Sequence, residues 1–269
     1  QPVQDVITQL FSHLPKSSIH LFSCGHVIPK TNMKCICIGK GPSGKEIELT
    51  YSKRSQNHVL EEIGRALVNI CSIVPAGVVC FFASYAYEEE CYLYWKSNGI
   101  LNRITAKKDL FREPRIASQS DAVLAQYSSC CVDSNSEKKG AILLSVVGGK
   151  LSEGINFKDD MARCVVMVGL PFPNRYDPEL MVRFKFLEQH NISSSEYYEN
   201  ICMKKVNQSI GRSIRHINDY ACIVLLDKRY KNQNIINKLP KWIVDDMSVA
   251  QTFGMAYRDL FQFFKSKNK

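Results

Sequence analysis

The stretch VNQSIGRSIRHINDYACIVLLD, residues 206–227, joins a helical pattern to a strand pattern. At about 100° per residue, one narrow helix face carries Gln208, Gly211, Arg212 and Arg215. Arginine keeps its charge at any working pH and binds phosphate with a planar fork of donors. The two aligned arginines therefore indicate either an anion opposite them or a solvated basic face, and their spacing alone leaves both readings open.

The opposite face of this helix is apolar, because it carries Val206, Ile210, Ile214 and Ile217. We expect that face to pack on a core. Residues 221–226, ACIVLL, are short, apolar and rich in β-branched side chains, which predicts a buried strand.

Apolar runs without alternation recur at residues 77–82, 141–147, 163–170 and 221–226, with helical patterns between them. Such runs are typical of parallel strands that are buried on both faces. The sequence therefore predicts an α/β fold with a mostly parallel sheet covered by helices on both faces. The helical patterns cover residues 55–73, 84–97, 118–131, 177–190, 252–265 and a segment that continues through residue 206 to residue 216.

Composition is that of an ordinary globular protein of 269 residues, with 45% hydrophobic and 23% charged residues. No apolar run is long enough to span a bilayer and no signal peptide pattern opens the chain, so we expect no membrane partner. The first residue is Gln1 rather than Met, which suggests a piece of a longer protein. The net charge of +9 suits a polyanionic partner, although a solvated surface also accounts for it.

The eleven cysteines are scattered, and neither Cys35/Cys37 nor Cys130/Cys131 has C-x-x-C spacing. We interpret them as reduced, mostly buried thiols of an intracellular protein. We expect no zinc or iron–sulfur site made from this chain alone, because the ligand spacing is unsuitable.

A glycine-rich turn, GKGPSGK at residues 39–45, separates two apolar runs at 33–38 and 46–51 that predict a hairpin. The turn matches most of a phosphate-binding P-loop. However, Glu46 stands where Ser or Thr should hold magnesium, and the following residues are strand-like, whereas a P-loop opens a helix. We predict that this loop binds no nucleotide. Residues 100–114 are interpreted as a basic connection and residues 238–242 as a turn.

Three loops follow expected strands, at residues 83–85, 148–157 and 171–174. Parallel sheets bind ligands beyond the carboxyl ends of their strands, so these loops are expected to form a site. The arginine-bearing helix precedes a strand instead. Its arginine face must therefore approach that rim, or a partner, from the side.

These segments resemble the motifs of superfamily-two helicases. The pattern Q-x-x-G-R-x-x-R at 208–215 resembles motif VI, and GGKLSEGINF at 148–157 resembles motif V of the iron–sulfur DNA helicases related to xeroderma pigmentosum group D protein. FFASY at 81–85 resembles motif IV, with Ala83 where relatives often have Pro. GLPFPN at 169–174 resembles the segment after motif V, and residues 1–5 resemble the tail of motif III.

Within that group the chain is most similar to the DEAD/H-box helicases of sister-chromatid cohesion, the ChlR/Chl branch. The segments behind this resemblance include FSCGHVIP at 22–29, RCVVMVGLPFPN at 163–174 and NQSIGRSIRH at 207–216. SEGINF at 152–157 also agrees, with Asn156 where many relatives carry Asp.

The resemblance implies that residues 31–269 form the second RecA-like motor domain and that residues 1–30 are a linker from a missing first motor domain. ATP and Mg would bind between the two domains, and a 4Fe-4S cluster would belong to the missing half. We then expect the chain alone to lack ATPase activity. The implied partners are single-stranded or forked DNA, the N-terminal motor domain, and proteins of cohesion and the replication fork, in the nucleus and with 5′ to 3′ polarity.

The resemblance also implies roles for the motif VI residues. Arg212 and Arg215 would act as arginine fingers on the γ-phosphate. Gln208 would orient the nucleotide or the attacking water, and Gly211 would let the helix approach its partner. His216 is expected to be structural or solvent-facing, because no acid or nucleophile is placed to work with it.

For the motif V loop, the resemblance implies nucleotide contacts. Gly149 belongs to a loop that brings backbone close to a ligand, and Glu153 and Gly154 would touch both nucleotide and DNA backbone. Asn156 would hydrogen-bond ribose or hold the loop.

DNA backbone contacts would come from Ser84, Lys150 and Ser152, and for Ser84 plain helix capping is the alternative. The alternative for the whole chain is a non-catalytic nucleic-acid-binding or scaffold domain that kept the motor fold. The aligned arginines argue against it, since a scaffold does not need them.

Overall fold

The structure is a computed structural model that describes residues 28–133, 137–151, 159–212 and 216–267, the single residues 157 and 214, and, near the start, residues 7, 10, 11 and 13–22. Within these residues seven strands form one sheet in the order β3-β4-β2-β5-β6-β1-β7, and every strand pair is parallel. The predicted α/β fold with a parallel sheet is therefore confirmed. The strands are β1 (Met33–Ile38), β2 (Val78–Phe82), β3 (Asp109–Arg112), β4 (Ala141–Val146), β5 (Cys164–Val168), β6 (Ala221–Leu226) and β7 (Met247–Ala250).

Burial on both faces explains the unbroken apolar runs. Every residue of β2, β4, β5 and β6 is buried. In the middle of the sheet Phe81 is paired with Ser145 of β4 and with Met167 of β5. The edge strands β3 and β7 are only partly buried and carry polar residues, as exposed sheet edges commonly do.

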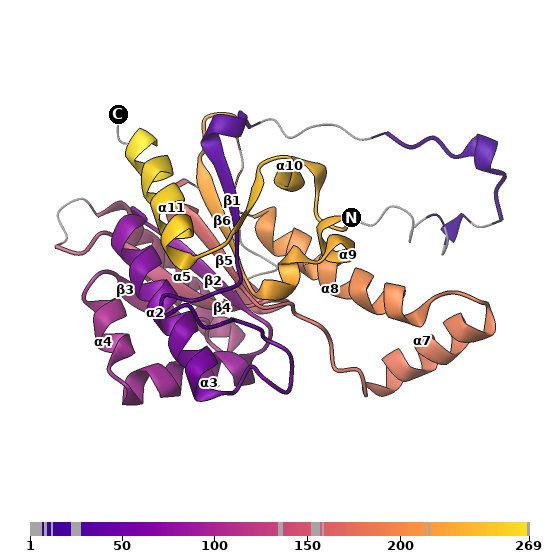
Figure 1. Cartoon of the computed structure of the whole chain (residues 1–269), viewed down its shortest axis with the longest axis horizontal. Helices are drawn as coiled ribbons and strands as arrows, with labels where there is room; N and C mark the ends of the chain where they lie inside the picture. The colour runs from indigo at the N-terminus through magenta and orange to yellow at the C-terminus, as the bar shows by residue number, and fades with distance from the viewer. Residues whose placement is uncertain are drawn as a thin grey trace.

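Helices cover both faces of the sheet (Figure 1). One hydrophobic cluster lies between the sheet and α2, α3, α4 and α11, and the other lies between the sheet and α5, α8, α9 and α10. No helix in the described ranges is both long and apolar enough to cross a membrane. The α-helices that lie wholly within the described residues are α2 (Asn57–Ile73), α3 (Tyr85–Ser97), α4 (Ile100–Thr105), α5 (Ser120–Val132), α7 (Pro178–Gln189), α8 (Ser194–Ile210), α9 (Gln233–Ile236), α10 (Lys241–Val244) and α11 (Phe253–Lys267). Short 3-10 turns are η1 (Lys16–Ser18), η2 (Lys30–Asn32), η3 (Ala117–Gln119), η4 (Asp159–Ala162) and η5 (Lys228–Lys231).

The predicted hairpin of residues 33–38 and 46–51 is wrong. The first run, β1, lies between β6 and β7 as a parallel strand, and the two runs are linked in the described structure by the single antiparallel bridge Lys40–Glu46. The glycine loop between them wraps around Glu62 of α2. The backbone N–H of Ser43 donates to Glu62 Oε2 at 2.9 Å and the Ser43 hydroxyl donates to Oε1 at 2.6 Å. A Cβ atom on Gly41 would lie only 2.0 Å from Glu62 Oε2. The loop that resembles a P-loop thus holds an anion of its own chain.

Two further segments are more regular than predicted. Residues 100–114 contain α4 and β3 rather than an irregular connection. Glu88 of α3 accepts two hydrogen bonds of 2.7 Å from Arg112 and so neutralises a charge on the edge strand β3. The stretch around the predicted turn at 238–242 contains α9, α10 and β7, and β7 pairs with β1 over residues 247–250.

Candidate functional site

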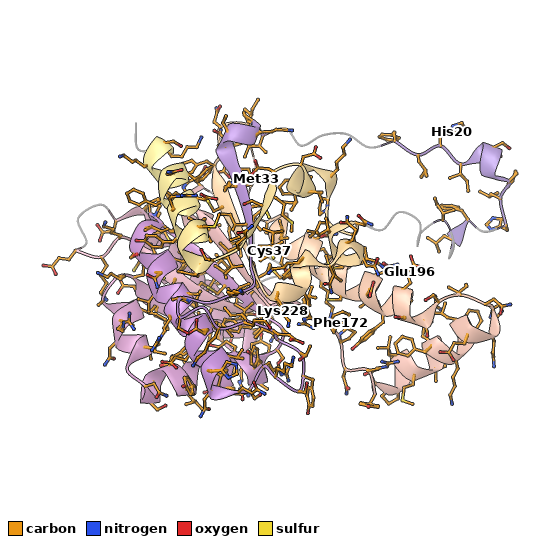
Figure 2. All side chains as sticks on the ribbon, in the orientation of Figure 1. His20, Met33, Cys37, Phe172, Glu196 and Lys228 are labelled. Atoms are coloured by element: carbon orange, nitrogen blue, oxygen red, sulfur yellow. The ribbon has the colours of Figure 1, made fainter. Side chains whose placement is uncertain are left out.

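A pocket of about 950 Å³ opens at the carboxyl edge of the sheet, where the loops after β1, β2, β5 and β6 meet. Phe172 and Lys228 lie at this edge, whereas Met33 marks the opposite edge (Figure 2). Among the described residues the lining contains cationic side chains but no carboxylate. The cations are Arg54, Arg175, Lys205 and Arg229.

Arg229 is fixed in place by the buried carboxylate of Asp227. Its Nη2 atom lies 2.7 Å from Asp227 Oδ2 and donates to the carbonyl of Leu49 at 2.8 Å. The same carboxylate accepts from the backbone N–H of Leu49 at 3.1 Å, so the loop after β1 is tied to the end of β6. Because the Asp227 carboxylate neutralises the Arg229 guanidinium, Arg229 adds little net charge to the pocket. It instead holds the residues of the pocket wall together.

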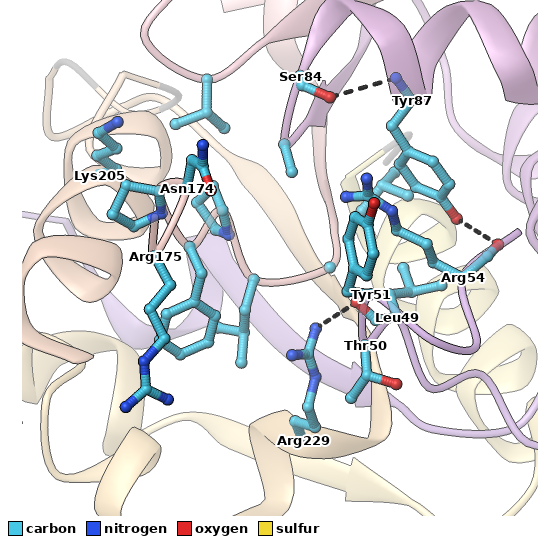
Figure 3. Close-up of a pocket in the computed structure, with 18 of the residues that line it drawn as sticks. Leu49, Thr50, Tyr51, Arg54, Ser84, Tyr87, Asn174, Arg175, Lys205 and Arg229 are labelled. Carbon is cyan, nitrogen blue, oxygen red and sulfur yellow. Dashed lines mark hydrogen bonds between the residues drawn. The ribbon is translucent and has the colours of Figure 1, made fainter. Parts of the chain in front are cut away.

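The other three cations differ from Arg229. Within the described residues, Arg54, Arg175 and Lys205 have no carboxylate oxygen within 4.0 Å of their charged nitrogens. Figure 3 shows Arg54 on one side of the pocket and Arg175 and Lys205 on the other. Three cations that face one cavity and have no carboxylate partner among the described residues favour an anionic ligand.

Ser84 lies in the pocket lining and also caps α3. Its hydroxyl accepts a hydrogen bond from the backbone N–H of Tyr87 at 3.2 Å (Figure 3). The capping alternative is thus realised in the structure. The same side chain also borders the pocket. Its contact with a DNA phosphate stays a prediction.

Glu113, which directly follows β3, holds the start of the loop after β4. Its Oε2 atom accepts from the Ser145 hydroxyl at 2.6 Å and from the Val146 backbone N–H at 2.9 Å. Its Oε1 atom accepts from the Tyr85 hydroxyl at 2.8 Å and from the Leu151 backbone N–H at 3.1 Å. Four donors therefore converge on one buried carboxylate. Burial, and then the neighbouring Glu113, raises the pKa of Tyr85 to about 12.

The two glycines after β4 are each required for a different structural reason. Gly148 adopts φ 77°, a left-handed conformation that other residues rarely take. A Cβ atom on Gly149 would lie 2.2 Å from Glu113 Oε1, so the close approach to Glu113 requires glycine there. The Lys150 side chain is exposed beside them. The remaining predicted residues of this loop, Ser152, Glu153, Gly154 and Asn156, lie outside the described residues, and their roles stay predictions.

The helix predicted to run through residue 216 is too long. Helix α8 ends at Ile210, and Gly211 closes it with a backbone hydrogen bond to Asn207 O of 3.0 Å. Glycine is about 1 kcal/mol less favourable than alanine in a helix, which weakens the helix at this point. Gln208 is exposed on the last turn, and Arg212 is half-buried just beyond it. Arg215 lies outside the described residues.

The apolar side of the predicted helix is only partly confirmed. Val206, Ile210 and Ile214 are buried against the second cluster, as expected. Ile217 is 57% exposed, contrary to the prediction, because the chain has left the helix axis before it. A Cβ atom on Gly211 would meet only its own helix within 4 Å among the described residues, nearest at Asn207 O, and the predicted close approach of a partner to Gly211 stays a prediction.

After α8 the chain is tethered to η4, which follows the motif V stretch. His216 Nε2 lies 2.8 Å from Asp159 Oδ1, so the expectation that no acid stands beside it is wrong, whereas its exposed side chain agrees with a solvent-facing histidine. Asp219 completes a group of potential metal ligands whose atoms lie within 4.8 Å of one another. However, Asp219 is buried and bound to Arg163 Nη1 at 2.8 Å, so ion pairing accounts for this group.

Several lining residues were not predicted from the sequence, namely Tyr51, Arg54, Arg175, Lys205 and Arg229. They lie on loops or helix faces without motif character. One signal was available, because Arg175 and Tyr176 directly follow the predicted turn at 171–174, beyond the end of a strand.

The described cysteines are free, and nine of the ten are buried, as predicted; Cys24 lies outside the described residues. Burial raises the pKa of Cys71 to about 12 and that of Cys131 to about 12, so both thiols are poor nucleophiles and poor metal ligands.

Comparison with known proteins identifies the family. A model of the helicase C-terminal domain matches residues 67–246, two thirds of the chain. The chain belongs to this helicase C-terminal domain family. Among its relatives, the ATP-dependent DNA helicase DDX11 of Danio rerio is 47% identical over 100% of this chain and 32% of its own length. The ATP-dependent DNA helicase CHL1 of Candida albicans is 44% identical over 93% of this chain and 30% of its own length.

These relatives confirm the resemblance to the ChlR/Chl branch. The chain spans about a third of the length of the curated relatives it matches, as the 32% for DDX11 of Danio rerio shows. Solved structures agree at the level of fold. Xpd4 of S. tokodaii gives a TM-score of 0.54 at 18% identity, over 88% of this chain and 42% of that one. An XPD helicase gives a TM-score of 0.53 at 22% identity, over 81% of this chain and 35% of that one. The predicted RecA-like fold is therefore confirmed.

Proposed function

We propose that this chain is the second motor domain of an ATP-dependent DNA helicase. The observation that carries the proposal is a cationic pocket, with no carboxylate among its described lining residues, at the carboxyl edge of a sheet of the helicase C-terminal family. In such sheets ligands bind beyond the carboxyl ends of the strands. The relatives' name, ATP-dependent DNA helicase, agrees with this chemistry.

We propose that the residues at and just after the end of α8 contact the nucleotide. Arg212 and Arg215 would stabilise the charge on the γ-phosphate oxygens in the transition state, and Gln208 would orient the nucleotide or the attacking water. ATP and Mg would be shared with a first motor domain, which would supply the phosphate-binding loop. The glycine loop at residues 39–45 does not replace it, since Glu62 occupies its anion position.

The nucleic-acid half concerns the pocket and the loops beside it. Ser84, Lys150 and Ser152 would contact DNA phosphates, with Arg175 and Lys205 adding charge from the opposite side. Contacts to backbone phosphates are independent of sequence, which suits an enzyme that must move along any strand. Gly149, Glu153, Gly154 and Asn156 would link this surface to the nucleotide.

The broader setting rests on the resemblance to the helicases of sister-chromatid cohesion. We propose residues 1–30 as the linker and residues 31–269 as the motor domain, with the 4Fe-4S cluster in another part of the protein. A nuclear location, 5′ to 3′ movement, forked DNA as substrate, and proteins of cohesion and replication as partners belong to the same proposal.

The test is ATP turnover in the complete protein that carries this chain, after Arg212→Ala or Arg215→Ala. An arginine finger contributes roughly 10³–10⁵ in rate, so each substitution is expected to abolish measurable turnover while ATP binding persists. Arg258→Ala is the matched control, because Arg258 is an exposed arginine on α11. Normal turnover in both finger variants would reject the finger assignment and favour the non-catalytic, nucleic-acid-binding alternative.

A further inference from the structure

Tyr51 presents an almost bare aromatic ring at the rim of the pocket. The residue is 86% exposed; of the other lining aromatic residues Tyr176 is comparably exposed, at 80%, whereas Tyr87 is buried. The guanidinium carbon of Arg54 lies 5.1 Å from the centroid of the Tyr51 ring and 5.1 Å from the centroid of the Tyr87 ring. One cation therefore lies between an exposed ring and a buried ring (Figure 3).

This stack is anchored from several directions. The buried Tyr87 donates its hydroxyl hydrogen to the carbonyl of Arg54 at 3.1 Å, and the Arg54 backbone N–H donates to Thr50 O at 2.9 Å. Leu49, which precedes Thr50, is held at both of its backbone polar groups. Its N–H donates to the Asp227 carboxylate, and its carbonyl accepts from the Arg229 guanidinium. A ring held on such a support loses little conformational entropy when a ligand packs on it.

The stack lies near groups that suit a phosphate. The Tyr87 backbone N–H donates to Ser84 Oγ, so the predicted phosphate contact and the aromatic stack belong to one connected unit. Across the pocket Arg175 and Lys205 provide positive charge (Figure 3). A flat apolar face on one side and cations on the other match a nucleotide unit of a single strand, which has a flat base and a charged backbone.

We infer that Tyr51, supported by Arg54, stacks on one unstacked base of the bound single strand. This inference rests on the proposed nucleic-acid site and adds a base contact to it. Stacking on tyrosine is tolerant of sequence because every base has a π-face. Arg54 strengthens the site, since a guanidinium is attracted to aromatic faces and its charge also favours the polyanionic strand.

The adenine of ATP is the competing ligand for the same platform, since it offers the same flat face. The position of Tyr51 favours the strand, because the ring stands at the carboxyl-edge pocket together with Ser84, whereas Arg212, one of the two proposed arginine fingers, follows α8, which leads toward the opposite end of β6. The experiment below separates the two ligands.

The test measures binding of an oligothymidylate to the complete protein by fluorescence anisotropy, for Tyr51→Ala and Tyr51→Phe. Loss of one stacking contact is expected to weaken binding roughly ten-fold in Tyr51→Ala, whereas Tyr51→Phe keeps the ring and stays within about two-fold. The dependence of log affinity on log salt keeps its slope in Tyr51→Ala, but the slope falls by about one in Arg175→Ala or Lys205→Ala, which remove a phosphate contact. Phe261→Ala, at a half-exposed aromatic residue of α11, is the control.

A series of oligonucleotides with one abasic position locates the contact. At one position of the series the abasic site is expected to weaken binding by wild type about as much as Tyr51→Ala does, and Tyr51→Ala is expected to add nothing there. Unchanged affinity in Tyr51→Ala, with weakened binding in Arg175→Ala, overturns the stacking inference and leaves the proposed DNA site standing. Unchanged affinity in all these variants contradicts the DNA site itself. A loss of ATP affinity in Tyr51→Ala without a loss of DNA affinity assigns the platform to adenine and overturns the inference.

Discussion

The hydroxyl of Tyr85 donates a 2.8 Å hydrogen bond to Oε1 of Glu113. Tyr85 ends the motif IV stretch, and the same oxygen accepts from the backbone N–H of Leu151 in the motif V stretch. One carboxylate atom thus joins the two loops that the proposed mechanism assigns to DNA and to the nucleotide. A displacement of one loop relative to the other would therefore break at least one of these two hydrogen bonds.

We predict that Glu113→Gln lowers both stability and DNA-stimulated ATP turnover in the complete protein. The side-chain NH2 group of the glutamine would face hydrogen-bond donors that face a carboxylate oxygen in wild type. An unsatisfied buried polar group costs about 1–3 kcal/mol. Chemical denaturation and steady-state ATPase assays measure the two effects. Glu196→Gln, at an exposed residue of α8, is the control. Wild-type values for both quantities in Glu113→Gln would show that the connection is dispensable.

Gly149→Ala is expected to displace Glu113, because the added Cβ would lie 2.2 Å from Glu113 Oε1. Glu113 is held by four donors and cannot move away without losing some of them, so we expect a destabilisation of about 1–3 kcal/mol. Gly254→Ala, where the Cβ would have nothing within 4 Å, should be neutral or slightly stabilising. Equal denaturation midpoints for the two variants would contradict this reading of the loop.

Lys45→Met is predicted to leave ATP turnover and the KM for ATP unchanged. Lys45 has the position of a P-loop lysine, but its loop holds Glu62 and its side chain is exposed. A true P-loop lysine reaches the phosphates, so its loss would be severe. A large rise in KM or a loss of turnover in Lys45→Met would show that this loop binds nucleotide after all.

Lys108 gives the fold a pH dependence. Its side chain is fully buried and donates to the carbonyls of Ala76 at 2.6 Å and Lys139 at 2.7 Å. Burial lowers its pKa from 10.5 to about 8. Between those values the unfolded chain binds more protons than the folded chain, so the contribution of Lys108 to stability rises with pH from about 8 to about 10.5.

The measurement is the free energy of unfolding between pH 7 and pH 10 for wild type and Lys108→Met. As the pH rises, the free energy of unfolding of wild type is expected to increase relative to that of Lys108→Met, by on the order of 1–3 kcal/mol in total. The variant also loses two hydrogen bonds, so the change with pH, rather than the absolute stability, carries the test. Lys107→Met, at the exposed neighbour, should follow wild type at every pH. Parallel curves for wild type and Lys108→Met would contradict the account.

The buried parallel strands could be predicted because burial on both faces leaves a signal in local sequence. Residues 221–226 are apolar throughout and residues 141–147 are apolar except for Ser145, and both segments form strands at the centre of the sheet. The edge strands could not be recognised in this way. β3 contains Asp109 and Arg112, and its pairing depends on contacts with Glu88 and with β4.

The site was predictable where it follows an expected strand or coincides with a motif. The loops that contain Ser84 and Gly149 were expected beyond strand ends, and the structure places both residues there, while their roles toward a ligand stay predictions. Tyr51 and Arg54 were missed, because their position is set by contacts between distant parts of the chain. The hydrogen bond from Leu49 to Asp227, which fixes their loop, joins residues 178 positions apart.

The central claim is that this chain holds half of a shared ATP site. The most direct measurement is DNA-stimulated ATP turnover by the purified chain of 269 residues, compared with the complete protein under the same conditions. Circular dichroism establishes beforehand that the purified chain is folded. We predict turnover by the complete protein and none above background by the chain. Robust DNA-stimulated turnover by the chain alone would contradict the claim.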